Sequence, residues 1–113
     1  MACIFCRIVS GQAPAEILFQ DQDVTAFRDI HPVAPVHVLL VPNRHLTSVN
    51  DVTPADEAML GHLFGVARQL ADGLGVAAQG YRMIVNTGAD GGQVVPHLHV
   101  HLIGGRRMRH PMG

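Results

Sequence analysis

Hydrophobic and polar positions follow two different periods along the chain. Short apolar runs, rich in β-branched residues and bounded by turn-forming residues, predict strands. These runs cover residues 17–20, 24–29, 37–41, 81–86 and 94–103. Asp21-Gln22-Asp23 separates the first two runs, so this stretch predicts a hairpin turn. The last run is the most regular, because histidines and apolar residues alternate strictly in it.

Elsewhere an apolar residue recurs at every third or fourth position, which predicts a helix over residues 53–74. Thr53 suits the N-cap, Pro54 suits the first helical position, and Gly73 is a stop signal. The expected apolar face consists of Met59, Leu60, Leu63, Phe64, Ala67, Leu70, Ala71 and Leu74. A short helical turn is expected over residues 3–9.

One long helix among strands predicts an α+β domain with a mainly antiparallel five-stranded sheet and a short N-terminal helix. The length of 113 residues allows one such domain, residues 1–113, with an irregular tail over 104–113. Apolar residues make up 48% of the chain and charged residues only 15%, which excludes disorder over most of it. A domain this small cannot bury so much apolar surface, so we expect part of it to contact another subunit.

A net charge of −1 excludes a protein that binds nucleic acid through bulk positive charge. We interpret Arg106-Arg107-Met108-Arg109-His110 as a solvated patch, because no basic face extends it. No apolar run reaches the ~20 residues that a membrane-spanning helix needs. The first residues lack the pattern of a signal peptide. We therefore expect a cytoplasmic protein that binds neither nucleic acid nor membranes.

Eight histidines are the unusual feature of the composition. In a strand, His97, His99 and His101 would share one side while the apolar residues between them pack into the core. Two kinds of chemistry fit such a row. Three imidazoles can bind a catalytic zinc, or one imidazole can attack phosphorus while its neighbours manage protons and charge. The glycine-rich stretch 87–93 favours phosphorus chemistry, because backbone N–H groups in such loops can hold a phosphate.

The stretch His97-Leu98-His99-Val100-His101-Leu102-Ile103 resembles the His-φ-His-φ-His-φ-φ signature of the histidine triad (HIT) superfamily. Similarity to its HINT branch, the histidine triad nucleotide-binding proteins, covers almost the whole chain. It rests on residues 80–86, 90–93 and 104–106, and on Ile4-Phe5, Pro14-Ala15, Phe27, Asp29-Ile30, Pro35, His37 and Pro42. The resemblance implies a homodimer that binds purine nucleotides. It also implies hydrolysis of nucleoside phosphoramidates and aminoacyl adenylates through a nucleotidyl-histidine intermediate.

The resemblance also implies roles for individual residues around the phosphate. His99 would be the nucleophile, and His101 would contact the phosphoryl oxygens and help to protonate the leaving amine. His37 would be a further active-site histidine near the phosphate. Asn86 and the backbone of Gly92 would hold the non-bridging oxygens as charge develops on them.

A second set of residues would bind the nucleoside. Asp29 resembles the carboxylate that accepts hydrogen bonds from the ribose hydroxyls. The apolar slot for the base would consist of Phe5, Ile8, Phe27 and Ile30. Without the resemblance, core packing would be the favoured interpretation of these four side chains.

Cys3 and Cys6 form a Cys-x-x-Cys pair, which alone fits a redox pair, a metal clip or two apolar side chains. In many bacterial members of the HINT branch such a pair binds zinc together with two histidines. His45 and His97 occupy the matching positions. The resemblance therefore implies a closed tetrahedral zinc site with a structural role, and no catalytic cofactor.

Two residues depart from the pattern of the branch. Val94 stands where members often carry a serine that hydrogen-bonds the scissile region, so only its backbone N–H could contact the nucleotide. His110 stands where members often carry a tryptophan that reaches the partner's active site. We expect slower turnover rather than inactivity. His31 and His62 are interpreted as surface residues, the latter with a dimer contact as an option.

Several alternatives remain open from the sequence. The chain could be a dinucleoside polyphosphate hydrolase or nucleotidyl transferase of the same superfamily. It could instead be a non-catalytic module that binds a nucleotide or a partner protein. A catalytic zinc on the three alternating histidines is the remaining possibility.

Overall fold

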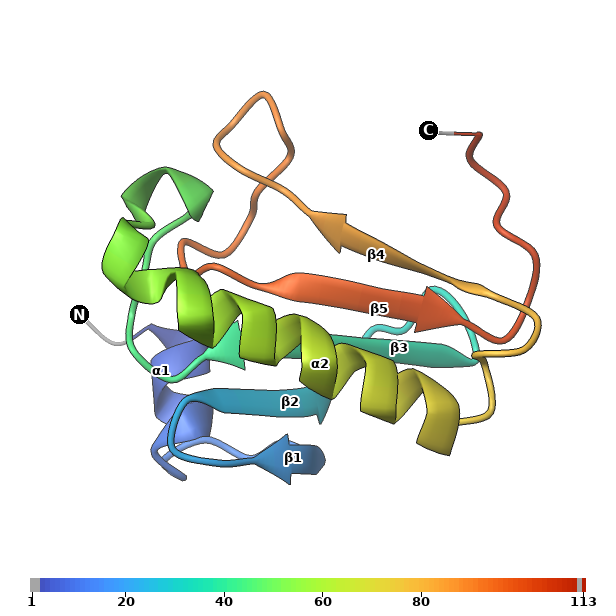
Figure 1. Cartoon of the computed structure of the whole chain (residues 1–113), viewed down its shortest axis with the longest axis horizontal. Helices are drawn as coiled ribbons and strands as arrows, with labels where there is room; N and C mark the ends of the chain where they lie inside the picture. The colour runs from blue at the N-terminus through green and yellow to red at the C-terminus, as the bar shows by residue number, and fades with distance from the viewer. Residues whose placement is uncertain (1–2, 112) are drawn as a thin grey trace.

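Five antiparallel strands form the central sheet of the computed structural model, which describes residues 3–111 and 113. Their order across the sheet is β1-β2-β3-β5-β4 (Figure 1). The strands are β1 (Ile17–Gln20), β2 (Val24–Arg28), β3 (Val36–Pro42), β4 (Tyr81–Val85) and β5 (Val100–Gly104). The α+β class and the five-stranded antiparallel sheet are thereby confirmed.

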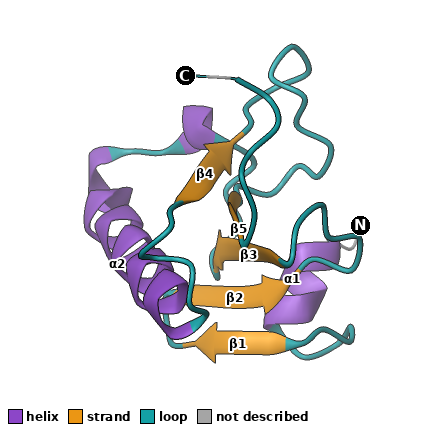
Figure 2. Ribbon diagram, turned by 90° about the vertical axis from the view of Figure 1, so that its right-hand side faces the viewer, coloured by secondary structure: helices purple, strands orange, loops and turns teal. Residues whose placement is uncertain are grey.

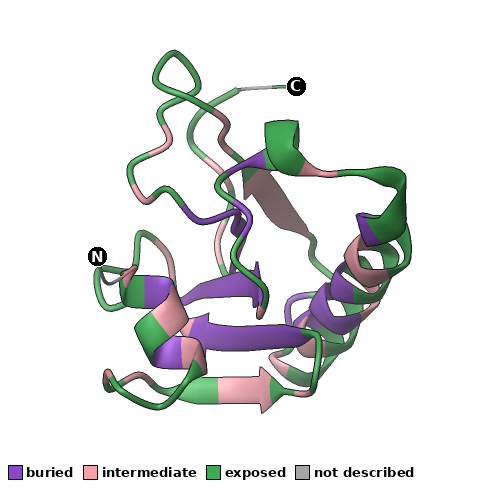
Figure 3. Ribbon diagram, turned by 90° about the vertical axis from the view of Figure 1, so that its left-hand side faces the viewer, coloured by how far each residue is buried: buried purple, intermediate pink, exposed green. Residues whose placement is uncertain are grey.

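The two α-helices lie on opposite faces of this sheet (Figure 2). α2 (Glu57–Gly73) crosses one face, and α1 (Ile4–Val9) packs against the other. The main core lies under α2 and includes Val24, Val38, Leu40, Leu63, Ala67 and Leu102. Strand β3 is buried along its whole length and β1 is only partly covered, so the centre of the sheet is the rigid part (Figure 3).

The long helix starts later than the sequence predicts. Two 3-10 turns, η1 (Val49–Asp51) and η2 (Pro54–Asp56), precede α2. The buried Asp56 carboxylate accepts the backbone N–H of Thr53 at 2.9 Å and forms an ion pair with Arg44. These contacts hold the first turn in the tighter 3-10 geometry, so regular α-helix begins one turn after the predicted cap.

One residue of the expected apolar helix face was assigned to the wrong side. Leu63, Ala67 and Ala71 are buried as predicted, and Val66 is buried with them. The side chain of Phe64, in contrast, is 55% exposed. Leu63, Val66 and Ala67 pack between α2 and the sheet. Phe64 therefore lies at the outer border of the apolar face of the helix.

The last strand is also shorter than predicted, because β5 begins at Val100 and not near residue 94. Pro96 has no backbone N–H for a strand ladder. The N–H of His97 turns back to the carbonyl of Val95 at 2.8 Å, and the N–H of Leu98 donates to Leu46 at 2.7 Å. Residues 94–99 are therefore an irregular approach to the strand, and of the three alternating histidines only His101 lies within it.

The predicted hairpin turn between β1 and β2 is present. One carboxylate oxygen of Asp21 accepts the N–H groups of Asp23 and Val24, both at 2.8 Å. Its other oxygen lies 2.6 Å from Nε2 of the exposed His62, so this surface histidine ties α2 to the turn. Among the residues that the structure describes, no helix is long and apolar enough to cross a membrane.

Candidate active site

A pocket of about 280 Å³ lies between α1 and the face of the sheet that α2 leaves free. Its lining includes Phe5, Ile8, Phe27, Asp29 and Ile30, which are all five residues expected to bind the nucleoside. The rings of Phe5 and Phe27 meet edge to face, with centroids 5.4 Å apart. Sequence reasoning missed Leu39 and Val95 in this lining; the first reads as an ordinary strand residue and the second as part of a loop. We name this cavity the nucleoside pocket.

Three histidines lie at one end of the nucleoside pocket. The ring of Phe5 is 5.1 Å from the ring of His99, which in turn lies 5.1 Å from the ring of His101. The ring of His37, from β3, is 5.2 Å from that of His101. The strand register explains this grouping, because His37 and His101 point to the same side of two paired strands. The structure thus brings together the three histidines predicted to act on the phosphate.

The orientation of His99 is set by a single backbone group. Its Nδ1 lies 2.7 Å from the carbonyl oxygen of His97. A carbonyl can only accept, so Nδ1 carries the proton and the lone pair of the neutral ring resides on Nε2. His99 as a whole is only 6% exposed, so its ring is held in place by its surroundings. The residue therefore presents one unprotonated nitrogen in a fixed direction, as a nucleophile requires.

A similar argument fixes the protons on His37 and His101. The backbone N–H of Val33 donates to Nδ1 of His37 at 3.2 Å, which leaves the proton of that ring on Nε2. This Nε2–H faces Nδ1 of His101 at 2.9 Å, so Nδ1 of His101 accepts. The proton of His101 then resides on its Nε2. Hydrogen bonds therefore run in one direction, from the amide of Val33 to His37 and from His37 to His101. No sequence pattern could have predicted the part played by the Val33 amide.

Both rings of this pair are neutral near pH 7. Burial lowers the pKa of His101 to about 4, and the nearby His99 and His37 lower it as well. Burial likewise lowers the pKa of His37, against the opposing charge of Asp29. An anionic group placed beside His101 would raise its pKa again, since an opposite charge favours the protonated form.

Asp29 lies between the nucleoside pocket and the histidines. One of its carboxylate oxygens accepts the N–H of His31 at 2.8 Å, and the other lies 3.4 Å from Nε2 of His37. The carboxylate is partly exposed at the pocket, so it keeps lone pairs that face a ligand. This geometry suits an acceptor for hydroxyl groups.

A second cluster, which we name the Cys₂His₂ cluster, consists of Cys3, Cys6, His45 and His97. Cys3 caps the N-terminus of α1, and Cys6 lies one turn later. The Sγ atoms of Cys3 and Cys6 lie 3.3 and 3.5 Å from Nδ1 of His97. Nδ1 of His45 lies 3.2 Å from Nδ1 of His97 and 3.3 Å from Sγ of Cys6.

These distances and donor types fit a tetrahedral zinc ion. Zinc bonds of about 2.0–2.1 Å to nitrogen and 2.3 Å to sulfur put tetrahedral neighbours roughly 3.3–3.8 Å apart. The distance of 3.2 Å between the two Nδ1 atoms is just below this range. Nε2 of the fully buried His97 donates to the carbonyl of Pro42 at 2.9 Å, so its Nδ1 lone pair points into the cluster. Burial, together with the adjacent Cys3, raises the pKa of the Cys6 thiol, and a cation at the centre would reverse that effect. The residues therefore suit a closed metal site.

Comparisons with known proteins agree with this geometry. Residues 10–108 match the family model of the HIT domain. The chain belongs to the HIT family. It is 48% identical over 103 residues to a purine nucleoside phosphoramidase of Escherichia coli, which covers 91% of this chain and 87% of that protein. This relative is a phosphoramidase by name, and a solved structural neighbour is a HIT family hydrolase, which supports the hydrolase class for this chain.

That neighbour is a HIT family hydrolase from Legionella pneumophila, with a TM-score of 0.95 and 43% identity over 99% of this chain and all of the other. A zinc-bound histidine triad protein from Mycobacterium smegmatis is similar as well, with a TM-score of 0.81 and 31% identity. The match covers 94% of this chain and 76% of that one. The resemblance found in the sequence is thus confirmed at the level of the family and of the hydrolase class.

The glycine-rich loop of this HIT protein is less clearly arranged for phosphate than the sequence predicts. Gly92 has a φ of +82°, and its N–H donates to the carbonyl of Ala89 at 3.0 Å. That amide is engaged within the loop, so holding a phosphoryl oxygen would require the turn to open. Asn86 directly follows β4 and lies one position beyond the Val85–Val100 pair, which places it opposite His99. The half-buried Asn86 is therefore the nearer oxyanion candidate.

The side chain of Val94 does not line the nucleoside pocket. It is 90% exposed, whereas the next residue, Val95, lines the pocket. The sequence predicts a contact through the backbone N–H of Val94 only, and that contact stays a prediction. His110 is exposed, and its carbonyl accepts from Arg82 at 2.8 Å.

Proposed function

We propose that this HIT family hydrolase cleaves the P–N bond of purine nucleoside phosphoramidates through a nucleotidyl intermediate on His99. We propose that it hydrolyses aminoacyl adenylates through the same intermediate. The observation that carries the proposal is the His99 orientation, with Nδ1 tied to the carbonyl of His97 and Nε2 left free beside the nucleoside pocket. The similarity to a purine nucleoside phosphoramidase supports the substrate class.

In the proposed complex the purine base lies between the apolar side chains of the nucleoside pocket. The rings of Phe5 and Phe27 contact it, and the exposed Ile30 closes over it. Asp29 accepts hydrogen bonds from the ribose hydroxyls. The 5′-phosphorus then lies toward His99, because Phe5 contacts both the pocket and that ring.

In the first step, Nε2 of His99 attacks phosphorus and the P–N bond of the substrate breaks. The leaving nitrogen takes a proton from His101, whose pKa rises when the anionic phosphoryl group lies beside it. Asn86 holds a non-bridging oxygen. In the second step, water attacks phosphorus, its proton passes to His101, and the bond to His99 breaks. The products are a nucleoside monophosphate and a free amine. For an aminoacyl adenylate the bond from phosphorus to the carboxyl oxygen breaks instead, and the amino acid leaves as a carboxylate that needs no proton.

The decisive experiment is mass spectrometry of protein quenched during turnover of an adenosine phosphoramidate. We expect an adenylyl adduct on His99 and no adduct or turnover in His99→Ala. Turnover without any modified histidine would contradict the proposed intermediate. Faster cleavage of a diadenosine polyphosphate than of the phosphoramidate would contradict the proposed substrate class.

We also propose that the Cys₂His₂ cluster binds a structural zinc ion, held by Cys3, Cys6, His45 and His97. The zinc-bound relative from Mycobacterium smegmatis supports this proposal. When bound, the ion would tie α1, which carries Phe5 and Ile8, to the segment that precedes β5. The His99 chemistry requires nothing from it.

We further propose that the protein is a homodimer. β4 is an outer strand of the sheet, and Val85 at its end is 39% exposed. Phe64 of α2 is a large apolar side chain left outside the core. Light scattering should give a mass of about 24 kDa, twice the 12.1 kDa of one chain. A mass of one chain at micromolar concentration would contradict the proposal.

A further inference from the structure

A second pocket, of about 200 Å³, lies beside the histidines on the side away from the nucleoside pocket. We name it the tail pocket, because residues of the C-terminal tail form one wall. Its lining includes Arg82 and Ile84 of β4, Ile103 of β5, and Arg106, Arg109 and His110 of the tail. Across the sheet, β2 and β3 carry the nucleoside pocket, β3 and β5 carry the histidine pair, and β4 and β5 carry the tail pocket.

The strand register shows how close the tail pocket lies to the reacting groups. Ile84 is the direct partner of His101, and Ile103 is the direct partner of His37. Partners in an antiparallel pair point to the same side of the sheet. Val33, whose N–H donates to His37, also lines the tail pocket. The tail pocket therefore lies directly beside His37 and His101 on the same side of the sheet.

The tail pocket is strongly positive. Residues 80–113 contain four arginines and one acidic residue, Asp90, whereas residues 1–79 contain four arginines and eight acidic residues. Within the part of the chain that the structure describes, the arginines in ion pairs are Arg28 and Arg44, and neither lines this pocket. Among the described residues, no carboxylate therefore forms an ion pair with the arginines of this pocket.

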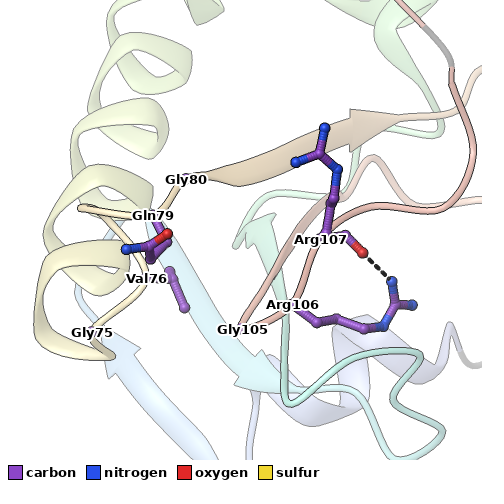
Figure 4. A pocket seen from close by; sticks show the side chains of 7 residues that line it. All are labelled: Gly75, Val76, Gln79, Gly80, Gly105, Arg106 and Arg107. Carbon is purple, nitrogen blue, oxygen red and sulfur yellow. Dashed lines mark hydrogen bonds between the residues drawn. The ribbon is translucent and has the colours of Figure 1, made fainter.

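Hydrogen bonds hold Arg82 and Arg106 in place without using up their donors. Arg82 donates to the carbonyl of His110 at 2.8 Å. Arg106 donates to the carbonyls of Arg107 and Val33, at 2.9 and 2.7 Å. Figure 4 shows the side chains of Arg106 and Arg107 extending in different directions. Both residues line a separate pocket with Gly75 and Gly80, and Arg106 lines the tail pocket as well. Each guanidinium has five N–H donors, so most of them remain available to an anion.

We propose that the tail pocket is a leaving-group subsite that selects amines carrying an anionic group, such as an amino acid joined to phosphorus through its nitrogen. This inference rests on the proposed function. The carboxylate of such an amine lies a few bonds from the scissile nitrogen and accepts paired hydrogen bonds from Arg82 and Arg109. When the P–N bond breaks, the nitrogen takes its proton from His101, and the free amino acid leaves past the tail.

Two substrates of the same size test the proposal: the adenosine 5′-phosphoramidates of 3-aminopropanoate and of its amide. We expect kcat/KM to be about tenfold higher for the carboxylate substrate, the size of effect that charge-assisted hydrogen bonds give. This preference should shrink as salt is added. Equal kcat/KM values for the two substrates would overturn the inference.

Variants then locate the effect. In R82Q/R109Q the preference for the carboxylate should disappear, while kcat/KM for the amide changes less than about twofold. The control R68Q removes a charge from exposed α2 on the opposite face and should keep the preference. An equal loss for both substrates in R82Q/R109Q would mean a structural role and overturn the inference. Turnover of the amide substrate by the unmodified protein tests the proposed phosphoramidase function on its own. The proposed function and the proposed leaving-group subsite can therefore fail separately.

Discussion

Nε2 of His37 lies 2.9 Å from Nδ1 of His101, and this contact determines which nitrogen of His101 carries a proton. Because the amide of Val33 occupies Nδ1 of His37, that ring can only donate through Nε2. The proton of His101 is thereby directed to its remaining nitrogen. The contact converts two neutral imidazoles, one buried and one half-buried, into a hydrogen-bond donor of defined direction.

The first prediction concerns the leaving group. His101→Gln should lower kcat by about 100-fold for an alkylamine phosphoramidate, because the departing nitrogen must be protonated. For an adenylyl nitrophenyl ester, whose leaving oxygen needs no proton, the loss should be below about tenfold. Steady-state rates with both substrates provide the measurement. Equal losses would assign His101 to phosphate binding alone.

The second prediction concerns stability in acid. The pKa of His101 in the folded protein is about 4, below its ordinary 6.5, so the unfolded chain takes up the proton first as the pH falls. This contribution is fully present above pH 6.5 and is lost between pH 6.5 and 4, on the order of 3 kcal/mol. The lowered pKa of His37 acts in the same direction. Urea unfolding at several pH values measures it.

The variant His101→Asn isolates this contribution, because it lacks the titrating ring. Its free energy of unfolding should fall less steeply between pH 6.5 and 4 than that of the unmodified protein under the same metal conditions. A parallel pH dependence in both proteins would contradict the assignment to His101.

The third prediction concerns the metal. Protein purified without chelator should contain about one zinc per chain, and a strong chelator should lower Tm on the order of 10 °C. His45→Ala should lose zinc, whereas the control His31→Ala, also an exposed histidine, should retain it. Elemental analysis and thermal melts measure both. Zinc retained in His45→Ala would contradict the proposed ligand set.

The fourth prediction concerns the nucleoside pocket. Ile30 is 81% exposed and yet lines the pocket, so truncation should cost binding and not stability. Ile30→Ala should raise KM about fivefold, as expected for losing apolar contact with a bound base. Tm should stay within about 2 °C. Val49→Ala, at an exposed residue of η1, is the matched control and should leave KM unchanged.

The fifth prediction concerns the loop before the histidines. A Cβ on Gly91 would lie 2.3 Å from the carbonyl oxygen of Thr87, so Gly91→Ala forces the loop to move. We expect a loss of stability of about 1–3 kcal/mol and a larger proportional loss of activity. Gly61→Ala, where a Cβ meets open space on α2, should be neutral or slightly stabilising. Unfolding and turnover assays compare the two variants.

Much of the fold could be predicted because the sequence is locally consistent. The apolar runs of β1 to β4 fall within one residue of their observed bounds, since Pro, Gly and Asp punctuate the chain between them. The start of β5 could not be predicted, because the turn at His97 depends on a hydrogen bond from Leu98 to the distant Leu46. Phe64 was misplaced because the width of a buried helix face is set by what packs against it.

The candidate site, too, could be predicted from the sequence only in part. Spacing identified His99 and His101, and the resemblance identified His37 and the five residues that prove to share one pocket. The role of the Val33 amide could not be read from the sequence, because any residue type supplies a backbone N–H. The positive charge of the tail pocket could not be predicted from the sequence either. Arg82 and Arg109 both line it, but most of β4, the loop and β5 separate them along the chain.

His97 belongs to both clusters at once. Its ring presents Nδ1 to the two thiols and His45, and its backbone carbonyl holds Nδ1 of His99. The proposed metal ligand and the carbonyl that orients the proposed nucleophile are therefore the side chain and the backbone of one residue, so a substitution of the His97 ring removes the ligand directly beside the group that holds His99. Cys3 also has a second role, because its side chain caps α1, whereas Cys6 lies one turn into that helix. Cys6 is therefore the position at which a substitution would remove a ligand of the proposed metal and leave both the helix cap and the carbonyl that holds His99 in place.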